Sequence, residues 1–459
     1  MSVNDGAQPV KPDHATTLGT GKVGRLLLEY SFPAIIGNSA ASLYNVIDRI
    51  FIGHGVGPMA ISGLALTFPM MNLAAAFGAL VGAGAAALVS IRLGQRNRQE
   101  ANVILGNTVF LNLVLSTAFS VVCLVFLDNA LFAMGASSQT LPYARQFMQI
   151  ILAGNVFTHL YLGLNNVMRA SGYPRKAMFT TLLTVGVNVV LAPLFIFVFG
   201  WGIRGAAFAT VCAQVVGTVR SVLHFAQKDS IVHFYPGCLK PNLRIIKDIF
   251  SIGMSNFVML FCASFVSVAY NLRLARFGGD YAIGAFGIVN SIASLVIMIA
   301  AGLNLGMQPI AGYNFGARKF DRVERVFRLA VICSTLVTTL GFILAEVFPS
   351  AVAKAFTTDG ELIDQSVVGM RLLMAMFPLI GFQMITSSFF QSIGKAKISL
   401  LLSLSRQVLL LIPCLIILPP YFGLRGVWLA GPVSDLMAAL VALLILKTQF
   451  RRRLTAHAV

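Results

Sequence analysis

Charged residues are scarce in this sequence: Asp, Glu, Lys and Arg make up 11% of its 459 residues, whereas hydrophobic residues make up 57%. A soluble protein of this length needs more charge to cover its surface. The six cysteines form no CxxC pair, so we expect neither a disulfide framework nor a metal site. The sequence has no nucleotide-binding loop or nucleophile arrangement, so we expect neither an enzyme nor an ATP-driven pump, and no cofactor.

Apolar runs of about twenty residues recur along the whole chain. Each run can cross a bilayer as a helix, because lipid offers no partner for backbone polar groups. No gap between the runs is long enough for a soluble domain. The sequence therefore predicts an all-α membrane protein with twelve transmembrane helices, at roughly 27–52, 60–90, 104–127, 144–168, 178–198, 204–226, 250–272, 281–309, 326–347, 366–390, 398–417 and 426–446.

The net charge of +18 could indicate a nucleic-acid-binding protein, but the placement of the charges argues against this interpretation. With the N-terminus inside, 24 of the 34 Lys and Arg residues fall in inside segments and seven in outside segments. Inside segments of membrane proteins carry such an excess. We therefore expect both termini in the cytoplasm and no nucleic-acid partner.

A repeat relates the two halves of the chain. A shift of 222 residues places Gly57 on Gly279, "LGQR" at 93–96 on "FGAR" at 315–318, and Gly172 on Gly394. Matches at several distant loops predict two copies of a six-helix unit. Six crossings return the chain to its starting side, so the copies are parallel repeats, an N-lobe and a C-lobe around a central cavity.

The helices and the repeat together divide the chain into five segments. We expect the first to be disordered and the third to contain a short interfacial helix. The segments are a cytoplasmic N-terminal tail at 1–26, the N-lobe at 27–226, a cytoplasmic linker at 227–249, the C-lobe at 250–446 and a basic cytoplasmic tail at 447–459.

Local strings across nearly the whole chain resemble the multidrug and toxic compound extrusion (MATE) family. The resemblance implies a bacterial inner-membrane antiporter that exports cationic or amphipathic small molecules in exchange for H⁺ or Na⁺. The strings are "NVIDRIFIGHGVGPMAISGLAL", "LGQRNRQEANVILGN", "NNVMRASGYPRKAM", "GMQPIAGYNFGARKFDRV" and "GLRGVWLAGPVSDLMAAL".

The first predicted helix carries a polar stripe. Asn38, Ser42, Asn45 and Arg49 recur at helical spacing, and Asp48 lies at the edge of their face. An ionisable group inside a membrane is expensive, about 2.5–3.5 kcal/mol at a helix centre. Asp48 is therefore either a coupling residue for H⁺ or Na⁺, or a structural acid beside Arg49. The family resemblance favours coupling, because the family's helix-1 Asp matches Asp48.

The fifth predicted helix carries a second stripe with Thr184 and Asn188. The resemblance implies a role for Asn188 in the ion site and, more weakly, for Asn166, whose alternative role is to cap its helix. The predicted ion-coupling residues are Asp48, Asn45, Thr184, Asn188 and Asn166. Many family members carry Asp where this chain has Ala192. A site with Asp48 as its only acid suits Na⁺ poorly, since Na⁺ coordination favours several oxygen ligands. H⁺ is therefore the expected coupling ion.

Two charged residues lie inside the last two predicted helices, Arg406 and Asp435. The helices are sequential and antiparallel, so the two side chains can meet. They form either a buried pair that fixes helix register, or a second titrating site or substrate anchor.

These features predict a monomeric secondary transporter for drugs or metabolites that works by alternating access. Two other functions compete with it. One is a flippase for lipid-linked precursors, which needs a strongly cationic cavity. The other is a receptor or channel without coupled transport.

Overall fold

In the computed structural model, the described residues, 14–134 and 136–456, form helices joined by short turns and one longer linker, without β-strands. Helices α1 to α8 make up the first half of the chain. They are α1 (His14–Thr20), α2 (Val23–Gly55), α3 (Pro58–Gly94), α4 (Arg98–Val125), α5 (Leu127–Ala133), α6 (Leu141–Ala170), α7 (Pro174–Pro193), its π-helical continuation η1 (Leu194–Val198) and α8 (Gly202–Ala226).

The second half repeats this order with two breaks inside long helices. α9 changes direction at Gly279, and α15 changes direction at Gly423. The elements are α9 (Leu243–Gly316), α10 (Phe320–Val347), α11 (Pro349–Lys354), α12 (Gly360–Met374), α13 (Phe377–Ser392), α14 (Ala396–Leu404), the π-helix η2 (Ser405–Leu410) and α15 (Leu411–Ala456).

The long helices make twelve membrane crossings. Nine described segments are long and apolar enough to span a membrane, and the pair α12–α13, bent by 47° just before Pro378, makes a tenth. The eleventh is α2, and the break at Gly423 divides the last segment in two. The predicted twelve-helix architecture is confirmed, although most helices run several residues beyond their predicted ends.

The backbone repeats as closely as the sequence does. Gly57 and Gly279 both have positive φ, as do Gly172 and Gly394, and each pair is 222 residues apart. The described non-glycine residues with positive φ are Arg96 (φ 60°) and Arg318 (φ 57°), again 222 residues apart. L-residues rarely adopt this conformation, so its recurrence at one offset shows that the two halves fold alike.

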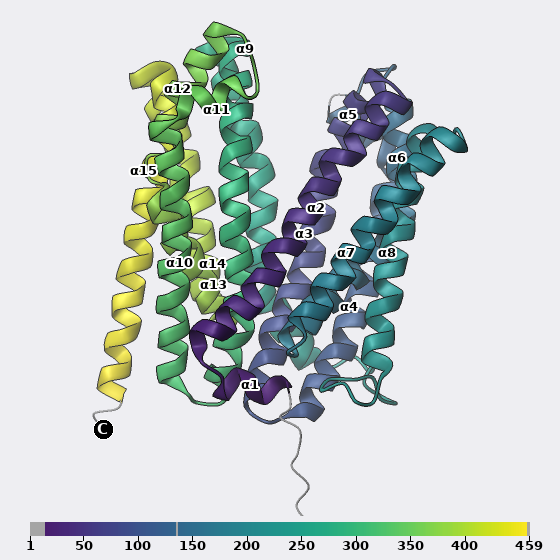
Figure 1. The fold of residues 1–459 in the computed structure, drawn as a ribbon, viewed down its shortest axis with the longest axis vertical. Helices are drawn as coiled ribbons and strands as arrows, with labels where there is room; N and C mark the ends of the chain where they lie inside the picture. The colour runs from purple at the N-terminus through teal and green to yellow at the C-terminus, as the bar shows by residue number, and fades with distance from the viewer. Residues whose placement is uncertain (1–13, 135, 457–459) are drawn as a thin grey trace, which may run out of the picture.

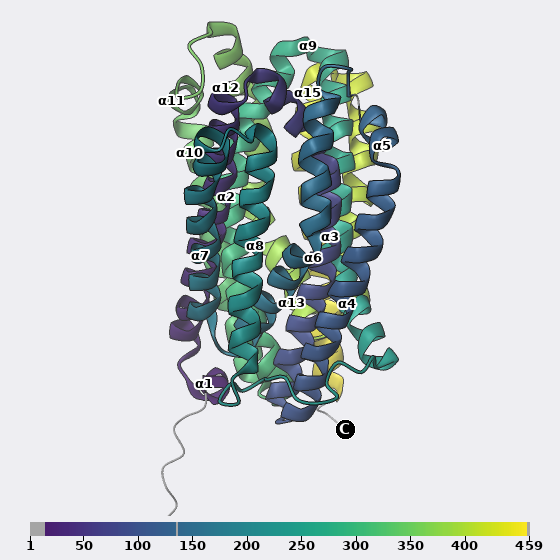
Figure 2. The same cartoon turned by 90° about the vertical axis from the view of Figure 1, so that its right-hand side faces the viewer.

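The halves form two lobes that meet at one end of the molecule (Figure 1). Both described ends of the chain lie at this end, which we call the terminal end. The first-half helices α3 to α8 and the second-half helices α9 to α15 diverge toward the opposite, far end. α2 begins beside the second lobe and crosses into the first. α7 and α8 lie side by side on the outer side of the N-lobe (Figure 2).

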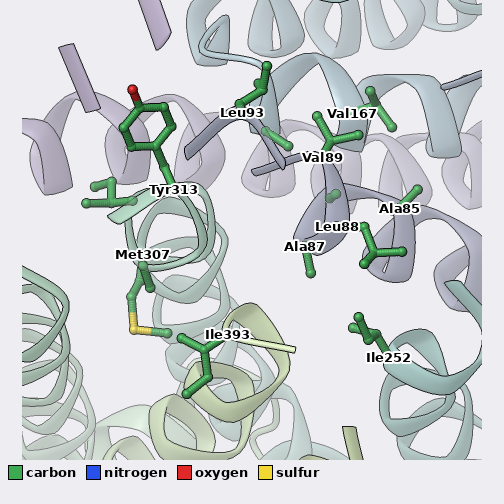
Figure 3. Packing of buried hydrophobic residues seen from close by; sticks show 14 of the residues in the cluster. Ala85, Ala87, Leu88, Val89, Leu93, Val167, Ile252, Met307, Tyr313 and Ile393 are labelled. Atoms are coloured by element: carbon green, nitrogen blue, oxygen red, sulfur yellow. The ribbon is translucent and has the colours of Figure 1, made fainter. Parts of the chain in front are cut away.

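Glycines allow the lobes to approach closely near the terminal end. A Cβ atom added to Gly94 of α3 would clash with the carbonyl oxygen of Tyr313 in α9, and one added to Gly316 would clash with that of Ile91. These two contacts are equivalent under the 222-residue repeat. Apolar side chains from both lobes surround the contact, among them Leu88, Ile252, Met307 and Ile393 (Figure 3). The terminal end is therefore closed by tight packing.

The expectation of a disordered tail at 1–26 is wrong for residues 14–26. They form α1 and the start of α2, and Leu18 is fully buried. Arg322 of α10 donates hydrogen bonds to the carbonyl oxygens of Leu18 (3.1 Å) and Gly21 (2.6 Å), and Asn314 donates to Leu18 (2.9 Å). Backbone acceptors of α1 thus satisfy C-lobe donors, which holds the segment in place. Residues 1–13 lie outside the described part of the chain.

The linker also differs from expectation. Residues 227–242 contain no helix, and α9 begins at Leu243 with Asn242 as its N-cap. The Asn102 side chain accepts a hydrogen bond from the backbone of His233 (3.0 Å), and Asn107 accepts one from Asn242 (2.8 Å). Because side chains of α4 accept hydrogen bonds from the linker backbone, the linker is ordered without an interfacial helix. The basic C-terminal stretch also continues α15 up to Ala456.

Candidate functional site

A cavity of about 670 Å³ lies between the lobes, lined by α2, α3, α6, α7 and α8 and by residues of α9. Its described lining combines small apolar residues with many amides and hydroxyls and contains no carboxylate. Such a surface can bind varied amphipathic molecules by dispersion contacts and adaptable hydrogen bonds. The polar residues used below are Asn38, Tyr44, Tyr161, Asn165, Asn166, Arg169, Thr181, Thr184, Asn188, Thr210 and Gln308.

Three helices of the N-lobe share a hydrogen-bond network at the cavity wall. The Tyr44 hydroxyl of α2 lies 2.9 Å from the Thr210 hydroxyl of α8. Asn188 of α7 donates to Tyr44 at 3.3 Å and to Thr210 at 3.2 Å. Because α2, α7 and α8 each supply one group, a shift of one helix must rearrange the hydrogen bonds of the other two.

Asp48 lies one helical turn beyond Tyr44 on α2. Its side chain is only 7% exposed, and its Oδ1 atom has no hydrogen-bond partner among the described residues. The neighbouring Arg49 guanidinium lies instead over the Phe68 ring, 4.9 Å from its centroid. A buried carboxyl without a cationic partner is the arrangement in which gain or loss of a proton changes local packing most.

The other predicted coupling residues have different surroundings. Asn188 is in the network, while the Thr184 hydroxyl donates to the Thr181 carbonyl (2.7 Å) on the cavity wall. Ala192, one turn beyond Asn188, is fully buried and adds no oxygen ligand. The side chain of Asn45 lies outside the described part of the structure.

Arg169 lies at the cavity, and no pattern discussed above had singled it out. Arg169 is in the last turn of α6 and lines the cavity. Its guanidinium donates to the side-chain oxygens of Asn165 and Asn166, both at 3.2 Å. No carboxylate of the described residues pairs with it. The spacing of Asn165, Asn166 and Arg169 on one helix face was the available signal. Gln308 of α9 also lines the cavity.

The C-lobe holds its acid differently. Arg406 Nε lies 2.8 Å from Asp435 Oδ1, and the two side chains are 20% and 10% exposed. The pair lines a smaller cavity of about 370 Å³ together with Tyr270. Arg406 is in η2, whose π-helical turn alters the side-chain direction within the helix. Asp435 is therefore ion-paired, whereas the carboxylate of Asp48 forms no ion pair with a described residue.

Two parallel six-helix lobes around a polar cavity, each lobe with a buried acid among its helices, place the chain in the class of two-lobed membrane transporters. Comparison with known proteins identifies the family. The MatE family model matches residues 33–194 and 256–417, one stretch in each lobe. The chain therefore belongs to the MATE family of efflux transporters.

Individual relatives agree along the full length. Multidrug export protein MepA of Staphylococcus haemolyticus (strain JCSC1435) is 26% identical over 94% of this chain and 94% of its own. The crystal structure of MATE in the bent conformation matches with a TM-score of 0.91 at 26% identity, covering 97% of this chain and 99% of that one. The MATE multidrug transporter DinF-BH in complex with R6G matches with a TM-score of 0.87 at 36% identity, covering 94% and 96%.

Proposed function

We propose that this protein exports amphipathic small molecules, cationic drugs included, in exchange for protons, and that Asp48 binds the exchanged proton. The burial of Asp48 carries the proposal: its carboxyl group has an unpartnered oxygen one turn from the network at the cavity wall. The alternative role of Asp48, a structural pair with Arg49, is disfavoured because Arg49 packs on Phe68.

The proposed coupling works through the charge of Asp48. Protonation removes a buried charge, so the packing of α2 against α7 and α8 changes with each proton taken up. Tyr44 lines the cavity one turn before Asp48, so the change would reach the ligand through the hydrogen bonds of Tyr44 with Asn188 and Thr210. Each proton that moves inward across 100 mV supplies about 2.3 kcal/mol for export.

A single buried acid favours H⁺ over Na⁺. Ala192, the position at which the family resemblance implies a second acid, supplies no side-chain oxygen. A Na⁺ ion that gives up its hydration water there would find few oxygen ligands to replace that water. A proton needs only the carboxyl group itself.

Orientation follows from the excess of basic residues at the terminal end. We place this end in the cytoplasm of a bacterial cell and the protein in the inner membrane. The central cavity then faces away from the cytoplasm, because the lobes are packed together at Gly94 and Gly316. Ligand would leave the cell from this state, and the reverse opening would load it.

Substrate recognition would rest on shape and dipoles. The described lining offers hydroxyls and amides, with Arg169 as its charged group. A cationic ligand would therefore be held by apolar contacts and by the oxygens of Tyr161, Asn38 and Gln308, without an ion pair.

Transport into everted vesicles tests the proposal. With an acidic vesicle lumen and no Na⁺, so that protons leave as dye enters, wild type should accumulate R6G and Asp48→Asn should not. Asp364→Asn makes the same chemical change at an exposed acid and should transport normally. The coupling scheme fails if Asp48→Asn accumulates R6G as fast as wild type. A Na⁺ gradient at equal pH should drive no accumulation; if it does, Na⁺ is the coupling ion.

The rival functions make different demands. A flippase for pyrophosphate-linked lipids needs several cations in the cavity, and the described lining holds one, Arg169. A receptor or channel would pass ions without substrate exchange. Proton flux in sealed vesicles that is independent of R6G would support that rival and exclude antiport.

A further inference from the structure

A second groove lies on the outer side of the N-lobe, between α7 and α8. It encloses about 500 Å³ and is separate from the central cavity. Apolar side chains line most of its length, including Leu183 of α7 and Val215, Val219 and Leu223 of α8. Leu183, Val219 and Leu223 are exposed, as expected for a surface that lipid covers.

The terminal end of this groove is polar and basic. Lys176, in the first turns of α7, and Arg220 and His224, one turn apart near the end of α8, line it. The groove's described lining contains no Asp or Glu. Both cations therefore face the groove without a carboxylate of that lining to neutralise them.

His224 adds a donor to these two cations. The Lys176 ammonium lies 3.5 Å from His224 Nδ1. An ammonium group can only donate, so Nδ1 is the acceptor and the ring proton belongs on Nε2. Nε2 is buried without a hydrogen-bond partner among the described residues, in a side chain that is 7% exposed. This N–H is therefore not committed to another described residue and remains available to an oxygen acceptor.

The Tyr173 ring limits how the basic end can rearrange. Lys176 Nζ lies 4.7 Å from the centre of this ring, and the His224 ring packs edge-on against it, also at 4.7 Å between centroids. Lys176 and His224 are thus both held against one aromatic wall. The donor set is preorganised, which lowers the entropy lost on binding.

We propose that this groove binds one anionic phospholipid, with its phosphate on Lys176, Arg220 and His224 and an acyl chain along Leu183, Val215 and Val219. Three donors and no carboxylate in the lining fit a phosphodiester oxygen cluster. The arrangement of basic and apolar residues also fits a phospholipid, because the basic end of the groove lies near the ends of both helices and its apolar part runs toward their middles. A zwitterionic lipid would bring its ammonium group to a site that already holds two cations.

Native mass spectrometry of the full-length protein in detergent tests this site. Wild type should retain one phosphatidylglycerol after delipidation and re-addition, and should retain phosphatidylethanolamine at least about tenfold less. The Lys176→Gln/Arg220→Gln variant should lose phosphatidylglycerol by about tenfold or more. The matched control, Arg175→Gln/Arg244→Gln, removes two exposed cations outside the groove and should bind like wild type.

A single substitution separates the donor from general charge. His224→Phe keeps a ring in place and removes Nε2–H, and it should weaken phosphatidylglycerol binding several-fold without changing net charge. Thermal unfolding gives a second readout: phosphatidylglycerol should raise the Tm of wild type and of the control, and should leave the double variant unchanged.

Three results would overturn the inference. The first is equal retention of the two lipids by wild type. The second is a double variant that binds phosphatidylglycerol as the control does. The third is displacement of the lipid by millimolar inorganic phosphate, which would make the groove a site for a soluble anion. None of these outcomes depends on proton-coupled export.

Discussion

The two lobes share one backbone and differ in how they hold a buried acid. Position 48 of the N-lobe corresponds to position 270 of the C-lobe under the 222-residue repeat, where the acid is replaced by the buried Tyr270. The C-lobe acid, Asp435, is paired with Arg406 at 2.8 Å. Arg406 in turn corresponds to Thr184 of the N-lobe. The two lobes therefore share a scaffold and hold a carboxylate in two ways, one in an ion pair and one with an unpartnered oxygen.

The largest expected effect contrasts these two acids directly. Asp435→Asn leaves the Arg406 guanidinium without its partner and should destabilise the protein by about 3 kcal/mol, since breaking a buried pair strands a charge. Asp48→Asn removes an unpartnered buried charge and should leave the protein as stable as wild type or more so. Thermal unfolding in detergent measures both.

A double substitution makes this contrast sharper. Arg406→Leu/Asp435→Leu removes both charges and should recover most of the stability that Asp435→Asn loses. If Asp435→Asn unfolds at the wild-type temperature, the pair does not hold helix register, and a ligand-binding or titrating role becomes the better explanation.

The next effect tests how similar the lobes are at their interface. Gly94→Ala and Gly316→Ala each place a Cβ against a carbonyl oxygen of the other lobe. Each should cost about 1–3 kcal/mol through overpacking, by similar amounts because the sites are equivalent. The control is Gly186→Ala, where an added Cβ meets nothing within 4 Å. Thermal unfolding provides the comparison, and unequal losses at the two sites would show that the interface is asymmetric.

The smallest effect concerns a difference in cavity charge. Arg169 corresponds to Gln391 in the C-lobe, so Arg169→Gln gives both lobes the same residue. Removal of a like charge from the cavity should tighten binding of the cationic dye R6G by about fivefold. Fluorescence polarisation measures the affinity, and Arg175→Gln controls for net charge. Unchanged affinity would place the bound dye away from the guanidinium.

Much of the fold followed from the sequence because lipid permits few alternatives. Apolar runs fixed the crossings, and the offset between Gly57 and Gly279 fixed the repeat. The ordered structure of residues 14–26 and of the linker could not be predicted from the sequence, because it depends on distant partners. These partners are Arg322 for α1 and Asn102 for the linker. Helical periodicity records only local neighbours.

The candidate site was predictable to a similar extent. Polar residues at helical spacing, such as Asn188, indicated the face that carries the network. The partners on other helices, Tyr44 and Thr210, became visible only in three dimensions. Arg169 was overlooked because its place near a helix end looked like an ordinary inside cation. Spacing could show that Arg406 and Asp435 were able to meet, and it could not show that they do.

The linker has a mechanical consequence for any motion between the lobes. Its residues are fastened to α4 by Asn102 and Asn107, up to the backbone of Asn242. The covalent connection therefore moves with the N-lobe as part of one body. Any pivot between the lobes therefore lies beyond Asn242, and lengthening the linker upstream of Asn242 would leave the amplitude of the rotation unchanged.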